Sequence, residues 1–183
     1  MKIQFQWAIV PLGILLLSMQ GSKLAKANNS SRNFQGQTVG HAENNPESNK
    51  AVIRKLYEEI LNYKKLELLP SVVSEAYVGP SGERGAAGIT ATIQGLLVAF
   101  PDIQWTIQEL IAEGSKVVVR WSWKGNHTGT FRGIAPTQKL FTNEAIAIYE
   151  LSDGKIVKAW LQSDRLGFVQ QMGLVDPELF KKK

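Results

Sequence analysis

The sequence predicts an α+β fold in which helices come first along the chain and an antiparallel sheet follows. The prediction depends on a change in the spacing of apolar residues at Pro101. Before Pro101 they recur at helical spacing, and after it they alternate with polar residues at a period of two. Because helical and extended segments are separated along the chain, they are expected to form separate layers of one domain.

The first predicted helix covers residues 49–65, NKAVIRKLYEEILNYKK. Its apolar side chains repeat every three to four positions, and Lys and Glu occupy the opposite face, as in an amphipathic helix. Asn45, Pro46 and Glu47 precede it as a cap, a first-turn proline and an acid near the positive end of the helix dipole. We therefore expect the helix to open at this tripeptide.

Two further helices are predicted before the change of period. Residues 66–82 predict a short second helix that ends at Gly79-Pro80. Residues 84–102 carry apolar side chains on one side and predict a third helix, which Pro101 stops. The threonines and glycines of this third segment weaken its intrinsic helix propensity, so packing is expected to stabilise it.

Four strands follow, each with alternating or continuous apolar character. They are predicted over residues 103–111, 115–129, 139–151 and 155–164. Turn sequences join the first two strands at 112–115 and the last two at 152–154, which indicates an antiparallel meander. Residues 165–175 are expected to close the domain as a short helix.

The first 27 residues have the character of a signal peptide. Lys2 gives a positive start, residues 7–17 are an almost unbroken apolar run, and Ala25-Lys26-Ala27 fits the small-x-small cleavage pattern. The apolar run is well short of the roughly 20 residues that span a bilayer. We therefore expect an exported bacterial protein, periplasmic or secreted, without stable membrane insertion after cleavage. An uncleaved anchor is the alternative.

The rest of the chain divides into a polar leader (28–48), one domain (49–176) and a basic tail (177–183). The net charge of +5 comes from the two ends, because the predicted signal contributes lysines without acids and the chain ends in three lysines. The domain itself is close to neutral, so nucleic acid is not an expected partner. The chain contains no cysteine, so burial alone must stabilise the fold.

Common cofactor and metal motifs are missing from the sequence. The domain has one histidine and no acid pair at ligand spacing, and it lacks nucleophile-elbow, Walker and dinucleotide fingerprints. Residues 127–137, HTGTFRGIAPT, contain glycines that suggest a phosphate cradle. Such a cradle needs a helix N-terminus or a nest of amides, whereas this stretch continues into a strand. We therefore expect a strand end and a wide turn, and no metal or cofactor.

The strings AFPDIQW, LIAEG, HTGTFRGIAPT, DGKIVKAW and LGFVQQMG occur in this order. Together they resemble the SnoaL-like polyketide cyclase, or ester cyclase, family over residues 49–175. The resemblance implies the cone-shaped α+β barrel of the nuclear-transport-factor-like superfamily. There, three N-terminal helices pack on a strongly curved antiparallel sheet around one apolar pocket. It also implies a homodimer or a higher homo-oligomer.

The best-studied members of that family close a ring by an aldol reaction without metal or cofactor. They use an aspartate on the last strand and a histidine on the strand before it. In this chain those positions fall on Leu161 and Ala147, which cannot transfer a proton, so the activity does not follow from the resemblance. The expected pocket residues are Tyr57, Trp121, Trp123, Ala147, Trp160 and Leu161.

Asp164 is the first candidate catalytic residue, and it matches an aspartate common in the wider family. Separations of two and four return to the same face of a strand, so Trp160, Gln162 and Asp164 are expected to point together. A carboxylate beside an indole can serve as a base. The alternative is a helix cap or an ion pair with Arg165 or Arg120.

His127 is the second candidate, because it follows Trp121 and Trp123 at a period of two and would face the same cavity. It would then orient or protonate a carbonyl oxygen. The alternative is a histidine at the pocket rim that is hydrogen-bonded to the following loop. Both tryptophans are expected to be core residues first.

Three functions remain open from the sequence. The leading hypothesis is an exported protein whose apolar pocket takes a small hydrophobic or carbonyl-bearing molecule, with Asp164 as base and His127 as acid if it is an enzyme. The second is a non-catalytic binding module of the same fold, which Leu161 and Ala147 favour. The third, epoxide hydrolysis, needs an Asp-Arg-Asp set, of which Asp164 and Arg120 supply only part.

Overall fold

The computed structural model describes residues 45–176. The predicted signal peptide, most of the leader and the basic tail therefore lie outside the described residues. Within residues 45–176, no helix has both the length and the apolar character needed to cross a membrane.

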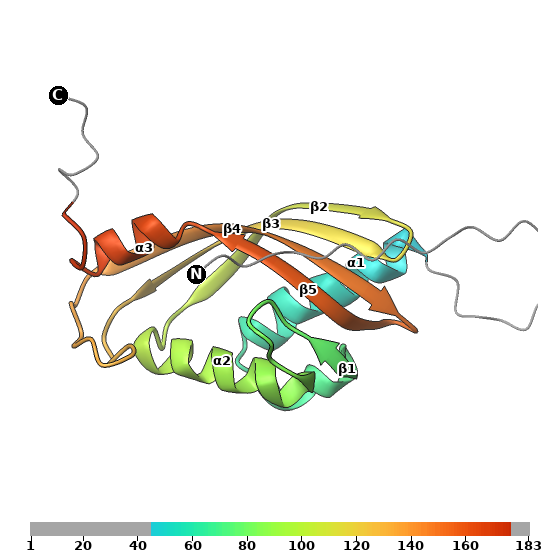
Figure 1. Cartoon of the computed structure of the whole chain (residues 1–183), viewed down its shortest axis with the longest axis horizontal. Coiled ribbons are helices and arrows are strands. Elements are labelled where there is room, and N and C mark those ends of the chain that lie inside the picture. Colours follow the sequence, from blue (N-terminus) through green and yellow to red (C-terminus); the bar gives the residue numbers. More distant parts are fainter. Residues whose placement is uncertain (1–44, 177–183) are drawn as a thin grey trace, which may run out of the picture. The chain divides into compact units, whose positions relative to one another are not determined.

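One sheet and three α-helices make up the described domain. The strands are β1 (Val73–Val78), β2 (Gln104–Glu113), β3 (Lys116–Asn126), β4 (Leu140–Ser152) and β5 (Lys155–Ser163), in the order β1-β5-β4-β3-β2. The α-helices are α1 (Pro46–Arg54), α2 (Gly85–Ala99) and α3 (Arg165–Gln171). Figure 1 shows α1 and α2 on one side of the curved sheet and α3 at one end of it. The predicted α+β fold class is confirmed.

The first helix opens as the sequence predicted. The Asn45 side chain accepts a hydrogen bond from the Glu47 N–H at 2.9 Å, and Pro46 occupies the first turn. After Arg54 the chain continues as a wider, π-helical segment (η1, Lys55–Leu61). Such segments are rare and are frequent at functional sites.

The predicted second helix over residues 66–82 is wrong in its larger part. Only Leu66–Ser71 (η2) is helical, as a short 3₁₀ segment, and the residues after it form β1. The strand forms because β1 pairs in parallel with β5, with Ile156 N donating to Val72 O at 2.8 Å. Tertiary pairing has overridden local preference. The sheet is therefore mixed, with one parallel edge strand added to the predicted antiparallel meander.

The meander of β2, β3, β4 and β5 is antiparallel throughout, as predicted. Side chains alternate strictly along β3, where Val117, Val119, Trp121 and Trp123 are buried on the helix side. The intervening side chains face away from α1 and α2. The core consequently lies between one face of the sheet and the helices.

An aromatic cluster closes the sheet at the end where β3 and β4 are joined. Its centre is Phe100, directly after α2, which is fully buried. Ring centroids lie 5.0–6.3 Å from Phe100 for five neighbours: Trp123, His127, Phe131, Phe141 and Phe168. This cluster joins α2, the sheet, the β3–β4 loop and α3.

The β3–β4 loop contains the stretch HTGTFRGIAPT and forms the predicted strand end and wide turn. His127 N donates to Lys139 O at 2.9 Å and Gln138 N donates to His127 O at 3.0 Å, which closes the neck of the loop. Thr128 N and Gly129 N both donate to Ala99 O at 3.1 Å. These bonds fix the loop against the C-terminal end of α2.

Candidate functional site

A pocket of about 650 Å³ lies between the helices and the inner face of the sheet. Apolar side chains form most of its lining, including Leu56, Leu61, Ile89, Ile93, Leu96, Trp105, Trp121, Trp123, Ala147 and Leu161. Its size and apolar walls fit a small organic ligand.

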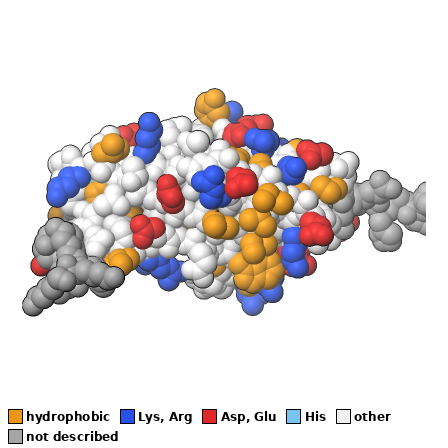
Figure 2. All heavy atoms as spheres, turned by 90° about the horizontal axis from the view of Figure 1, so that it is seen from above, with side chains coloured by type: hydrophobic (Ala, Val, Ile, Leu, Met, Phe, Trp, Pro, Cys, Tyr) orange, Lys and Arg blue, Asp and Glu red, His pale blue; other side chains and the backbone are white. Residues whose placement is uncertain are grey.

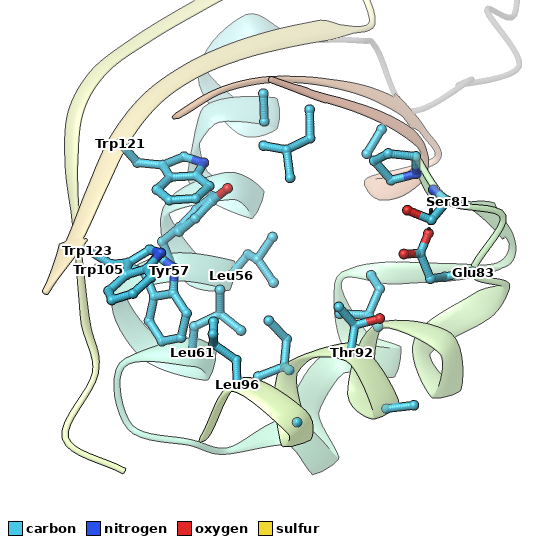
Figure 3. A pocket seen from close by; sticks show the side chains of 18 of the residues that line it. Leu56, Tyr57, Leu61, Ser81, Glu83, Thr92, Leu96, Trp105, Trp121 and Trp123 are labelled. Atoms are coloured by element: carbon cyan, nitrogen blue, oxygen red, sulfur yellow. Dashed lines mark hydrogen bonds between the residues drawn. The ribbon is translucent and has the colours of Figure 1, made fainter. Parts of the chain in front are cut away.

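Three tryptophans form one wall of this pocket. Trp105 of β2 is paired with Trp123 of β3, and Trp121 precedes Trp123 by two residues on the same face. Tyr57 of η1 joins them, with its ring centroid 6.0 Å from that of Trp121. Figure 3 shows these four side chains together on one side of the cavity. The wall therefore offers aromatic faces to a planar ligand.

The polar groups of this wall are a pair of phenols and an indole N–H. The hydroxyls of Tyr57 and Tyr149 are hydrogen-bonded at 2.7 Å, and either can be the donor. Burial raises the pKa of Tyr149 to about 12, and burial followed by the neighbouring Tyr149 raises the pKa of Tyr57 well above its usual value. Both phenols are therefore protonated at neutral pH.

Trp121 Nε1–H is buried and has no hydrogen-bond acceptor among residues 45–176. It lies close to the Tyr57 hydroxyl and lowers the pKa of Tyr57. This is the smallest of the contributions that change that pKa. Its position does not meet the geometry of a hydrogen bond. The indole N–H is consequently a buried donor without an acceptor, beside the Tyr57 hydroxyl.

Ala147 and Leu161 lie directly opposite each other in the β4–β5 pairing, and both line the pocket. This is the arrangement expected from the resemblance, in which two strands direct paired side chains into one cavity. In this chain the pair consists of apolar side chains, so this part of the wall has no proton donor or acceptor.

The match to a known protein family extends over most of the described domain. The chain matches the model of the family described as SnoaL-like polyketide cyclase over residues 51–172. The chain belongs to the SnoaL-like polyketide cyclase family. The resemblance inferred from the sequence strings is thereby confirmed.

Solved structures give the same fold for this SnoaL-like chain. TsrD from Streptomyces laurentii is 26% identical with a TM-score of 0.66, over 72% of this chain and 98% of TsrD. IdmH from Streptomyces antibioticus is 28% identical with a TM-score of 0.61, over 68% of this chain and 98% of IdmH. A SnoaL-like polyketide cyclase from Agrobacterium tumefaciens, at 15% identity and a TM-score of 0.60 over 68% and 98%, supports the fold alone. No curated protein sequence matches the chain.

Asp164 lies outside the pocket of this SnoaL-like protein. It is exposed and caps α3, where its Oδ1 accepts a hydrogen bond from Gly167 N at 2.8 Å. Trp160 lies on the outer face of β5, because the inward positions are taken by Ala159 and Leu161. β5 ends at Ser163, so Asp164 follows the strand as the cap of α3 and does not share a strand face with Trp160. The Trp160 ring is 40% exposed at the pocket rim, with Lys158 Nζ 4.7 Å from its centroid.

His127 is fully buried in the aromatic cluster and does not line the pocket. Its ring stacks on Phe100 at 5.0 Å, and its Nδ1 lies 3.2 Å from both the hydroxyl oxygen and the backbone nitrogen of Thr137. The expected histidine facing the cavity is thus placed beneath the following loop. The structure does not bring His127 and Asp164 together.

Tyr77 and Glu83 line the pocket and were not identified from the sequence. Tyr77 was missed because residues 66–82 were assigned to a helix, although Val73, Glu75 and Tyr77 already follow a period of two. Glu83 lies in a turn, where no periodic pattern reports the direction of a side chain. Among residues 45–176 no group of three or more His, Cys, Asp or Glu side chains is placed to hold a metal ion.

Proposed function

We propose that this SnoaL-like protein binds a flat, apolar molecule that carries a carbonyl oxygen. The observation that supports this best is the unpartnered indole N–H of Trp121 beside the Tyr57–Tyr149 hydroxyl pair, within an otherwise apolar wall. The proposal concerns binding first, because Leu161 and Ala147 replace the acid/base pair that the family resemblance implies.

The wall has more hydrogen-bond donors than acceptors for them. In the phenol pair one hydroxyl donates to the other, so the hydrogen of the second hydroxyl is not used in that bond. Together with the indole N–H, two donors remain for one ligand oxygen. A buried donor without a partner costs about 1–3 kcal/mol, which a carbonyl acceptor would recover. A ligand without an acceptor would leave this cost in place.

Replacement of Trp121 by phenylalanine tests the proposal, because it keeps an aromatic ring and removes the N–H. We expect the unmodified protein to bind 2-tetralone more tightly than tetralin, the same ring system without the carbonyl. In the W121F variant that ratio of affinities should fall about tenfold, the effect of one hydrogen bond. Isothermal titration calorimetry with both compounds measures it.

Replacement of Leu61 by methionine is the matched control, because Leu61 lines the same pocket and its side chain carries no hydrogen-bond donor. Here the preference for 2-tetralone over tetralin should be unchanged. Equal affinities of the unmodified protein for the two compounds would contradict the proposed role of the donors.

We also propose that the partner of this chain is a second copy, bound through the outer face of the sheet. An apolar row crosses four strands there, because the register aligns Ile111, Val118, Ile148 and Trp160. A parallel row alternates in charge: Glu113, Lys116, Glu150 and Lys158. Figure 2 shows hydrophobic side chains gathered on this face among acidic and basic ones. Such a surface is self-complementary, as a two-fold interface requires.

Replacement of Ile148 by glutamate places a charge in the middle of the apolar row. We expect the unmodified domain to sediment as a dimer at micromolar concentration and the I148E variant as a monomer with an unchanged circular dichroism spectrum. Analytical ultracentrifugation distinguishes them. Tyr63→Glu, at a side chain 70% exposed in the segment after η1, serves as the control and should remain dimeric. A monomeric unmodified protein would refute the dimer.

A further inference from the structure

A short turn between β1 and α2 carries a carboxylate into the pocket. Gly79 N donates to Glu83 O at 2.8 Å and Gly82 N donates to Gly79 O at 3.1 Å, so both ends of the turn are tied. Val78 and Arg84 pair across its base. Figure 3 shows Glu83 and Ser81 on the side of the cavity opposite the tryptophans. A rigid turn thus presents the Glu83 side chain.

The Glu83 carboxylate is oriented by one hydrogen bond and leaves one oxygen open. Ser81 N donates to Oε2 at 2.9 Å, and within residues 45–176 no hydrogen bond or ion pair engages Oε1. Glu83 is also the only carboxylate among the described residues that line the pocket. Its open oxygen is therefore available to a ligand.

Tyr77 of β1 brings a hydroxyl to the same place. A methyl group on Gly79 would collide with Glu83 Oε2 and would lie 2.9 Å from the Tyr77 hydroxyl oxygen, so both oxygens lie over the same glycine. Tyr77 is 4% exposed, and no hydrogen bond engages its hydroxyl within the described chain. Burial, and then the neighbouring Tyr149 and Glu83, raise its pKa, so the hydroxyl stays a donor at neutral pH.

We propose that Glu83 and Tyr77 form a proton-transfer site for the α-carbon of a ketone bound in the pocket. The inference rests on the proposed carbonyl ligand and adds a reaction to it. The carbonyl group is bound either at the Trp121 wall or turned across the pocket toward Tyr77 and Glu83, and only the second orientation reacts. A general base and an adjacent O–H donor are what enolisation requires. Gly79 is needed because any side chain there would fill the space in which the two groups meet.

The step balances without a co-reactant. The Glu83 carboxylate takes the proton from the α-carbon, and the C–H electron pair becomes the C=C bond of an enolate. The former carbonyl oxygen takes the negative charge and accepts the hydrogen bond of Tyr77. Return of the proton to carbon completes an exchange. Attack of the enolate carbon on a second carbonyl of the same molecule, followed by protonation of that oxygen by Glu83, completes an aldol ring closure.

The site lies apart from the paired positions Ala147 and Leu161, which are on β4 and β5. It would supply acid/base chemistry from the β1–α2 turn instead, in a pocket whose strand positions are apolar. Asp164 and His127 take no part, because neither lines the pocket.

Exchange of the α-protons of 2-tetralone in deuterated buffer tests the proposal without knowledge of the natural substrate. Proton NMR should show the unmodified protein accelerating exchange over buffer. Glu83→Gln should reduce the acceleration about 10²-fold or more, the size of a general-base contribution. Tyr77→Phe should reduce it about 10²-fold, as expected for one oxyanion donor. Binding of 2-tetralone, measured by calorimetry, should change less than about threefold in both variants.

Glu75→Gln is the matched control, because Glu75 is an exposed acid on the same strand as Tyr77. This variant should accelerate the exchange of the 2-tetralone protons as much as the unmodified protein does. Two results would overturn the inference and leave the proposed binding intact. One is that the unmodified protein binds 2-tetralone without accelerating proton exchange, and the other is that E83Q accelerates exchange as much as the unmodified protein. Absence of binding by the unmodified protein would overturn the proposed function, and the inference with it. Equal melting temperatures of E83Q and E75Q exclude misfolding as the cause of a loss.

Discussion

Replacing Phe100 by alanine is expected to lower the free energy of unfolding by about 3–5 kcal/mol, which is the range for a buried aromatic side chain. Phe100 is fully buried and contacts the rings of five neighbours from the sheet, the β3–β4 loop and α3. Its loss leaves a cavity at the point where α2, the sheet, the β3–β4 loop and α3 meet. Urea unfolding followed by circular dichroism measures the change.

Tyr63→Ala is the control for this measurement, because the Tyr63 ring is 70% exposed and its removal opens no cavity. Its effect should stay within about 0.5 kcal/mol. The cluster would not have the central role assigned here if Phe100→Ala cost less than about 1.5 kcal/mol.

Replacing Gly129 by alanine is expected to cost about 2–4 kcal/mol, although only one methyl group is added. That methyl would overlap the carbonyl oxygen of Val98, a backbone atom that no side-chain rotation can move away. The loop must then withdraw from the end of α2, and the hydrogen bonds from Thr128 N and Gly129 N to Ala99 O are weakened or lost.

Gly95→Ala is expected to change the stability of the domain in the opposite direction. Gly95 lies within α2, and a methyl group there would meet nothing within 4 Å. Because alanine has the higher helix propensity, this variant should gain about 0.5–1 kcal/mol. Thermal unfolding of both variants checks the pair. Similar shifts in the same direction would show that steric contact at Gly129 does not decide its role.

The elements with a strong local period were predictable from the sequence. Residues 49–65 have a clean helical stripe, and the strands after Pro101 alternate, so their positions follow from the spacing of apolar residues. The cap at Asn45 was equally predictable, because a capping side chain acts within two residues of its own position.

β1 was not predictable in this way. Its residues carry mixed helix and strand signals, and the strand forms because β5, far along the chain, offers it a parallel edge. For the same reason Tyr77 was not predicted to line the pocket, since the direction of its side chain follows from its position in a strand and not in a helix. Glu83 was concealed for a different reason: its direction is set by the hydrogen bonds of the 79–83 turn.

The placement of Asp164 and His127 separates the two kinds of information most clearly. The sequence predicted that Asp164 shares a face with Trp160, because alternation along a strand is local, but β5 ends at Ser163 and Asp164 is the cap of α3. It could not tell which face is covered by helices, and that decides whether a side chain meets the pocket or solvent.

By itself, then, the sequence determined the family, the α+β class and the apolar side chains at positions 147 and 161, where the resemblance implies an acid/base pair. The tertiary structure decided which polar groups meet inside the pocket: Tyr57 with Tyr149, and Tyr77 with Glu83. The physical reason is the separation along the chain over which each effect acts. Periodicity and capping act over a few residues, whereas convergence on a cavity depends on the pairing of strands and the docking of helices distant in sequence.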